Sequence, residues 1–130
     1  MRKKYKAGLA SLCLLALLGL PAWALEPAAQ PTERGIDVSA WQGEIDFAQV
    51  KQAGIETVYI RAGVGAFYKD PYFERNYENA KANGLQVGFY HYATPRTEGE
   101  ARQQAQFFAR LMAGKEPDCR PAMDFESFGH

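Results

Sequence analysis

Three acidic residues lie in or directly after β-type runs of the sequence, where carboxylates could do chemistry: Asp37, Asp124 and Glu126. Asp124 and Glu126 are two positions apart, and an extended backbone projects such side chains to the same face. Carboxylates that are crowded together repel each other, and this repulsion is one way in which an acid stays protonated near neutral pH. The pattern is therefore compatible with a glycosidase or with a metal site.

The same Asp-x-Glu spacing also occurs without catalysis. At the end of a strand it is common as the start of a solvated loop or as a helix cap. Metal binding is another interpretation, because hard cations prefer oxygen ligands, although no histidine stands beside the acids. Spacing by itself leaves all of these interpretations open.

Aromatic residues gather near the same predicted strand ends. Sugar rings pack their C–H faces on aromatic rings, so a carbohydrate cleft would use such side chains. Core packing is the alternative, and we favour it for Tyr59 and Phe89. Arg61 ends the second predicted strand, where it could hold a polar substrate group, pair with Asp37 or form a purely structural ion pair. The aromatic residues concerned are Trp41, Tyr59, Phe67, Tyr68, Phe89, Tyr90 and Tyr92, of which Trp41, Tyr90 and Tyr92 join Arg61 as substrate-binding candidates.

Four strand-type runs alternate with three helical patterns and position these residues. The runs are rich in β-branched and aromatic residues and cover 35–39, 57–60, 85–92 and 121–125. Helical crossovers between consecutive strands predict a parallel sheet that is covered on its outer side by the helices. Two α/β architectures fit this order: a small open sheet, or the first half of a (β/α) TIM-like barrel.

Each helical pattern is bounded by residues that start and stop helices. Asp46 is expected to cap the first helix, and Asp70-Pro71 to start the second with Asp at the cap. A capping box, Thr97-Glu98-Gly99-Glu100, is expected to start the third. The glycines expected to end them are Gly54, Gly84 and Gly114, and the third helix is expected to bury Ala101, Ala105, Phe108 and Met112.

Residues 1–24 have the pattern of a secretory signal peptide. A basic start precedes the apolar run Leu9–Leu20, which is shorter than the ~20 residues that span a bilayer. Pro21 and the A-x-A pattern at 22–24 follow it. We expect export to the periplasm or the extracellular space, with no stable membrane anchor after cleavage; an uncleaved anchor is the alternative. Residues 25–34 are expected to be a linker.

Composition and charge exclude several classes of protein. The chain has 15 Lys and Arg against 15 Asp and Glu, and 47% of it is hydrophobic, which argues against a disordered tail or a polybasic arm. Residues 25–130 carry 11 basic and 15 acidic residues, a net charge of −4, so nucleic acid is not an expected partner. The only cysteine of this segment is Cys119, so no internal disulfide can form, and the fold must depend on its core.

Six short motifs occur in order from residue 35 to residue 126. They are Gly35-Ile36-Asp37-Val38-Ser39, Trp41-Gln42-Gly43, Tyr59-Ile60-Arg61-Ala62-Gly63, Asp70-Pro71-Tyr72-Phe73 with Asn76, Gly88-Phe89-Tyr90-His91-Tyr92, and Met123-Asp124-Phe125-Glu126. Together they resemble the family 25 glycoside hydrolases, the N-acetylmuramidase-type lysozymes. The resemblance implies an irregular (β/α) barrel that cleaves the β-1,4 bond between N-acetylmuramic acid and N-acetylglucosamine in peptidoglycan. It implies no metal or organic cofactor.

The resemblance also implies roles for the three acids. Glu126 matches the family's general acid, Asp124 the second acid of the Asp-x-Glu pair and Asp37 the acid of the first strand. Either aspartate could stabilise the oxocarbenium-like transition state, or Asp124 could orient the 2-acetamido group for internal attack. A covalent nucleophile, substrate assistance and an activated water therefore all remain open.

Family members continue for several more strands, one of which contributes a further acid. We therefore expect residues 35–130 to be the N-terminal portion of the catalytic domain, truncated after the fourth strand, and the 130-residue chain to need its missing segment for activity. A truncated relative that only binds cell-wall glycan is the alternative function. A metal-dependent phosphodiesterase on a similar half barrel is a third class, which predicts sensitivity to chelators.

Overall fold

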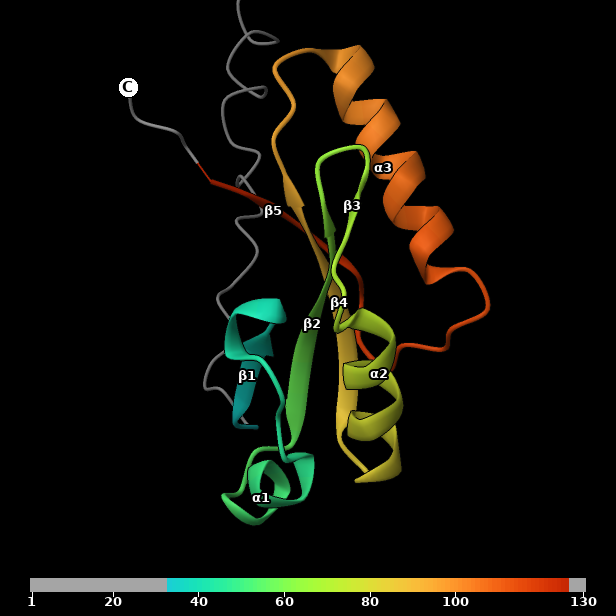
Figure 1. Ribbon diagram of the computed structural model, residues 1–130. Coiled ribbons are helices and arrows are strands. Elements are labelled where there is room, and N and C mark those ends of the chain that lie inside the picture. Colours follow the sequence, from blue (N-terminus) through green and yellow to red (C-terminus); the bar gives the residue numbers. More distant parts are fainter. Residues whose placement is uncertain (1–32, 127–130) are drawn as a thin grey trace, which may run out of the picture. The chain divides into compact units, whose positions relative to one another are not determined.

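The computed structural model describes residues 33–126, which fold around one curled, mostly parallel sheet (Figure 1). The predicted signal peptide, 1–24, and residues 25–32 of the predicted linker lie outside the described residues. The parallel strands lie in the order β1-β2-β4-β5, and β3 pairs with β2 in the antiparallel direction. The strands are β1 (Gly35–Val38), β2 (Thr57–Val64), β3 (Tyr68–Lys69), β4 (Gln86–Ala93) and β5 (Ala122–Phe125).

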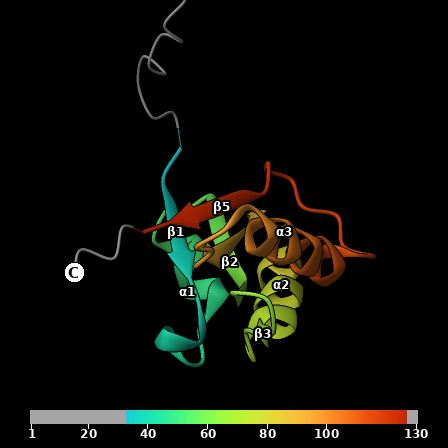
Figure 2. The same ribbon diagram turned by 90° about the horizontal axis from the view of Figure 1, so that it is seen from above.

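Helices connect the parallel strands, as the sequence predicts. They are the 3-10 helix η1 (Ala40–Gln42) and the α-helices α1 (Phe47–Gln52), α2 (Phe73–Ala82) and α3 (Glu98–Met112). Figures 1 and 2 show α2 and α3 along one face of the sheet, where they contact β2 and β4. The predicted alternation of strand and helix is confirmed, and the described fold is a curled half barrel rather than a flat open sheet. No helix within residues 33–126 is long and apolar enough to cross a membrane.

Side-chain alternation along the two central strands separates the core from the opposite face. Val58, Ile60 and Ala62 of β2 and Val87 and Phe89 of β4 point toward the helices and are fully buried. The residues between them point to the concave face of the sheet, where Tyr59 and Arg61 are partly buried and Gly88 is buried. The core also takes its helical members from Phe47, Phe73, Ala80 and Phe108.

A register shift between Arg61 and Gly63 changes this alternation at the carboxyl end of β2. After the shift Val64, rather than Gly63, is paired with Tyr92 and faces the concave side. Gly63 is required here, because a Cβ at this position would come within 2.4 Å of the carbonyl oxygen of Tyr68 in β3. Neither β3 nor the extension of β2 beyond Arg61 was predicted from the sequence.

Three local predictions were wrong. Helix α2 begins at Phe73 rather than at Pro71, since Pro71 and Tyr72 form a turn in which Oδ1 of Asp70 accepts from the backbone N–H of Tyr72. The capping box of α3 is only half formed: Thr97 accepts from the backbone N–H of Glu100, but Glu100 accepts from that of Arg96. On α3 the buried position is Gln104 rather than Ala105, since the amide oxygen of Gln104 accepts a hydrogen bond from the Thr94 backbone.

Candidate active site

The concave face of the sheet forms an open cavity of about 950 Å³. Every parallel strand contributes to its lining, because side chains at alternate positions of each strand point to this face. All seven residues predicted for the site line this cavity: Asp37, Trp41, Arg61, Tyr90, Tyr92, Asp124 and Glu126. The sheet therefore brings together residues that are up to 89 positions apart in the chain.

The three carboxylates approach the cavity from the two outer strands. Asp37 lies in β1, while Asp124 lies in β5 and Glu126 directly follows that strand. Asp124 and Glu126 share a face, as their spacing predicts. No ion pair within residues 33–126 involves any of the three. They can therefore serve as proton donors or as stabilisers of positive charge.

Two tyrosines of β4 lie between the carboxylates. The hydroxyl of Tyr92 donates a 3.4 Å hydrogen bond to Oε2 of Glu126. Burial raises the pKa of Tyr90, and the negative charges of Asp37 and Asp124 raise it further, against an opposing effect of Arg61. Desolvation and the nearby Glu126 carboxylate raise the pKa of Tyr92. Both phenols are thus neutral hydrogen-bond donors in a region of negative charge.

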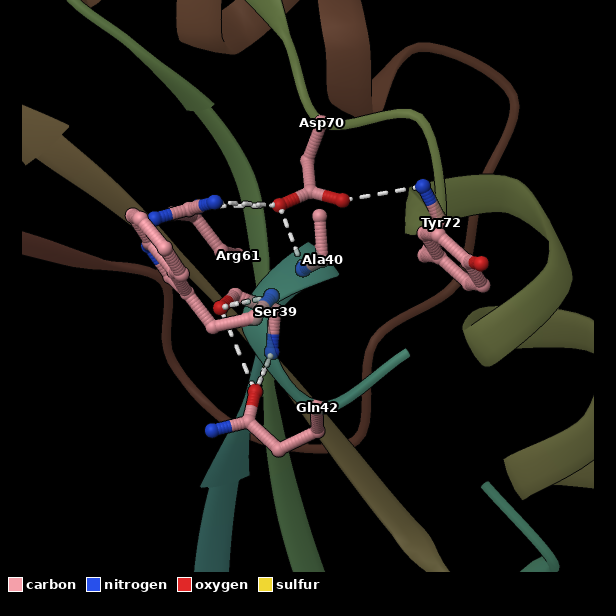
Figure 3. A network of polar contacts seen from close by, with 7 residues as sticks. Ser39, Ala40, Gln42, Arg61, Asp70 and Tyr72 are labelled. Atoms are coloured by element: carbon pink, nitrogen blue, oxygen red, sulfur yellow. Dashed lines mark hydrogen bonds and ion pairs between the residues drawn. The ribbon is translucent and has the colours of Figure 1, made fainter. Parts of the chain in front are cut away.

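Arg61 is paired with Asp70 and not with Asp37, which corrects one of the alternatives drawn from the sequence. Oδ2 of Asp70 lies 2.8 Å from Nη2 and 2.9 Å from Nε of Arg61 (Figure 3). The carboxylate is almost fully buried and the guanidinium is largely buried. Arg61 still reaches the cavity wall, and it also lines a smaller hollow of about 380 Å³ with Ala40, Trp41, Val64 and Tyr68.

Trp41 stands on η1 at the rim of the cavity. A capping box fixes this short turn: the Ser39 hydroxyl accepts from the Trp41 backbone N–H, and the Gln42 side chain accepts from the Ser39 backbone N–H at 2.8 Å. The indole is 85% exposed. Large exposed aromatic surface beside a polar cavity is suited to packing against a sugar ring.

Four lining residues were not among the predicted site residues. They are Ser39, Gln42, Tyr59 and Val64. Tyr59 is two positions before Arg61 in the same strand, so strand alternation could have placed it on the cavity face, and the interpretation of Tyr59 as a core residue was wrong. Phe89, by contrast, is fully buried, as predicted. The spacing Ser39-x-x-Gln42 is a capping-box signal, whereas nothing in the sequence marks the bulge that turns Val64 to the cavity.

The other predicted aromatics lie away from the main cavity. Tyr68 lines the smaller hollow, and Phe67 is exposed in the turn before β3. Within residues 33–126 no group of three or more His, Cys, Asp or Glu residues is arranged to hold a metal ion. The side chains that line the main cavity include carboxylates, phenols and one guanidinium.

Comparison with known proteins identifies the family. The sequence model of the glycosyl hydrolases of family 25 matches residues 36–130, which include every lining residue of the cavity. The chain belongs to glycosyl hydrolase family 25. The family 25 resemblance of the six motifs is thereby confirmed.

Relatives of this family 25 chain include bacterial lysozymes. It is 39% identical over 93 residues to the autolytic lysozyme of Clostridium acetobutylicum, covering 72% of this chain and 28% of that one. It is 43% identical over 94 residues to lysozyme M1 of Streptomyces globisporus, covering 72% and 32%. The solved lysozyme of Streptomyces coelicolor is 44% identical, with a TM-score of 0.55 over 62% of this chain and 37% of that one. The family 25 chain thus spans about a third of the length of these curated relatives.

Proposed function

We propose that this protein is a peptidoglycan hydrolase that cleaves the β-1,4 bond between N-acetylmuramic acid and N-acetylglucosamine. The observation that carries the proposal is the convergence of Asp37, Asp124 and Glu126 on one cavity with aromatic walls. Membership of family 25 and the similarity to lysozymes over about 72% of the chain support it.

In the proposed reaction Glu126 is the general acid. It transfers its proton to the glycosidic oxygen as the bond from that oxygen to the anomeric carbon breaks, and the leaving sugar departs as an alcohol. Positive charge develops on the anomeric carbon and ring oxygen. A water molecule then supplies the hydroxyl group to that carbon and its remaining proton to a carboxylate, so that the enzyme is restored.

Asp37 and Asp124 are proposed to stabilise the positive charge that develops on the sugar. Both lie on the concave face, and the negative charge of each raises the pKa of Tyr90. The alternative role for Asp124 is to orient the 2-acetamido group for internal attack. The anomeric configuration of the first product separates an inverting reaction from the two retaining routes. A trapped glycosyl-enzyme separates a covalent nucleophile from substrate assistance.

The walls of the cavity are proposed to bind the glycan strand. Trp41 offers an exposed ring at the rim, and Tyr90 and Tyr92 offer phenols beside the carboxylates. Arg61 contributes N–H groups to the same wall. In a sugar bound here, stacking on an aromatic ring would replace hydration of the C–H face. The hydroxyl and amide groups of the sugar would find polar partners in the same wall.

The substrate places the reaction outside the cytoplasm, in agreement with the signal-peptide pattern at 1–24. We propose that the protein acts in the periplasm or the extracellular space, and that the complete catalytic domain is a (β/α) barrel of which residues 35–130 form the first portion. Sequencing the amino terminus of the exported protein tests cleavage after Ala24.

The deciding experiment compares wild type with Glu126→Gln, both as the complete catalytic domain, in release of reducing ends from purified peptidoglycan. We expect the variant to lose activity by about a hundredfold or more while it still binds glycan, because only the acid proton is removed. Glu56→Gln, at an exposed position outside the cavity, is the matched control. Equal activity of wild type and Glu126→Gln would refute the role of Glu126.

Two other outcomes decide between the alternatives. Glycan binding without cleavage by wild type would favour a truncated relative that only binds the cell wall. Loss of activity in EDTA would favour metal-dependent chemistry, whereas carboxylate catalysis predicts that a chelator has no effect.

A further inference from the structure

The Asp70 carboxylate joins three separate segments of the chain. Its Oδ2 atom accepts from Arg61 of β2 and, at 3.0 Å, from the backbone N–H of Ala40 in η1. Its Oδ1 atom accepts at 2.9 Å from the backbone N–H of Tyr72, just before α2 (Figure 3). Asp70 is itself 1% exposed and does not line the cavity.

The partners of Asp70 carry the parts of the wall proposed to bind glycan. Arg61 lines both hollows, and Ala40 directly precedes Trp41 in η1. η1 has only three residues and makes few backbone hydrogen bonds of its own, so its position depends on side-chain caps. Ser39 and Gln42 cap it from within, and Asp70 is the contact that ties it to β2.

Arg61 likewise has one charged partner within residues 33–126. The contacts from its Nε and Nη2 atoms go to the same oxygen of Asp70. Nη1 has no hydrogen bond or ion pair within residues 33–126, and it belongs to a side chain that lines the cavity. A planar guanidinium held on one edge offers its other edge in a fixed orientation.

We infer that Asp70 is a positioning residue for glycan binding, which holds the guanidinium of Arg61 and the turn that carries Trp41 in fixed places on the cavity wall. The inference rests on the proposed function, because the ligand that it positions for is the glycan strand. Asp70 acts only through these two neighbours and does not touch the substrate. Its removal should therefore impair binding more than the chemical step.

The first test measures position without using activity. Amide hydrogen exchange at Ala40 is compared in wild type and Asp70→Asn, a change that keeps the shape but removes the charge. We expect exchange at Ala40 to become about tenfold faster, as for loss of a hydrogen bond to a charged acceptor. Exchange at Ile60, in the core of β2, should change far less.

Asp46→Asn is the matched control for this test. Asp46 is a second aspartate whose carboxylate caps backbone N–H groups, those of Ala48 and Gln49, but it lies outside the cavity. The Asp46→Asn substitution should leave amide hydrogen exchange at Ala40 unchanged. Equal acceleration at Ala40 and Ile60 in Asp70→Asn, or no acceleration at Ala40, would overturn the inference, since either result means that Asp70 does not hold η1 locally.

The second test measures hydrolysis of soluble glycan oligomers. For Asp70→Asn we expect KM to rise by about tenfold and kcat to change by less than about threefold. In the double variant with Arg61→Lys, the KM effects should be non-additive, because both changes break the same pair. A fall in kcat alone, or strict additivity, would overturn the inference.

The two tests separate this inference from the proposed function. If wild type neither binds nor cleaves glycan, the proposed function fails, and the inference that Asp70 positions a glycan-binding wall is overturned with it. If wild type is active and Asp70→Asn changes neither exchange at Ala40 nor KM, the inference fails while the proposed function stands.

Discussion

The hydroxyl of Tyr92 donates a hydrogen bond to Oε2 of Glu126, although 34 residues separate them in the chain. The parallel register explains the contact. Tyr92 of β4 is paired with Asp124 of β5, so Glu126 comes two residues later on the same face. This pairing connects the proposed general acid to β4, which lies inside the sheet between β2 and β5.

Replacing Tyr92 by Phe should therefore weaken catalysis with little effect on folding. Loss of one hydrogen bond of about 1 kcal/mol corresponds to about a fivefold lower kcat, measured as reducing-end release. Tyr68→Phe is the control, since Tyr68 is half exposed and does not line the main cavity. An unchanged kcat in Tyr92→Phe would show that the contact does not assist Glu126.

Gly88→Ala should disturb both the sheet and the cavity. A Cβ at this position would lie 2.5 Å from the ring of Tyr59, which covers Gly88 on the concave face. We expect a loss of about 2 kcal/mol in the free energy of unfolding in urea, as for overpacking, together with weaker glycan binding. Gly99→Ala in α3 is the control, because its nearest contact would be at 3.9 Å. Equal stability of the two variants would contradict the expected close packing of Tyr59 on Gly88.

His91 should make stability fall on acidification. The ring is fully buried between β2 and α3, stacks on Phe108, and its Nε2 contacts the carbonyl oxygen of Gly65. Burial lowers the pKa of His91 below its ordinary value of 6.5, against a smaller raising effect of the Gly65 carbonyl. As the pH falls, the unfolded chain then takes up a proton at His91 before the folded chain does. The contribution of His91 to the free energy of unfolding is therefore complete above pH 6.5 and is lost below it.

The measurement is the free energy of unfolding of wild type and His91→Gln at several pH values. The advantage of wild type should shrink as the pH falls from about 7 to about 5. A constant difference would show that His91 is as easily protonated in the folded state as in the unfolded state. Asp46→Asn serves as a control without a histidine change.

Asp118 should also make the stability of the fold depend on pH, at lower pH than His91 does. Its carboxylate accepts from the backbone N–H of Val87 at 2.8 Å and from Lys81 at 2.9 Å, which ties the loop before β5 to β4 and α2. The hydrogen bond from Val87 and the one from Lys81 hold the pKa of Asp118 below its ordinary value of 3.8. The stabilisation is therefore fully present above that value and is lost as the pH falls below it through the lower pKa of the folded state.

Asp118→Asn should cost about 1 kcal/mol at neutral pH, a figure kept low because the side chain is partly exposed and screened by solvent. Urea unfolding of both proteins at neutral and at acidic pH checks this. The difference should vanish once the carboxylate of wild type is protonated. A difference that persists in acid would mean that shape, rather than charge, holds the loop.

The sequence by itself determined the order of the elements and most of the lining of the cavity. Strand alternation placed Asp124 with Glu126, and the composition of the runs located the four parallel strands, because both depend on neighbours a few residues away. The six motifs indicated the family, which the comparison confirmed. These features are local and survive without knowledge of the fold.

Only the tertiary structure decided which distant groups meet. Arg61 pairs with Asp70 rather than with Asp37, because the short β3 hairpin returns the chain to the end of β2. No local sequence pattern encodes that return. The other oxygen of the same carboxylate, Oδ1, accepts from Tyr72 in the turn that precedes α2. The bulge after Arg61 turned Val64 into the cavity, since one extra residue reverses the alternation of a strand. Register and pairing are set by contacts across the whole sheet, and for that reason they could not be predicted from the residues alone.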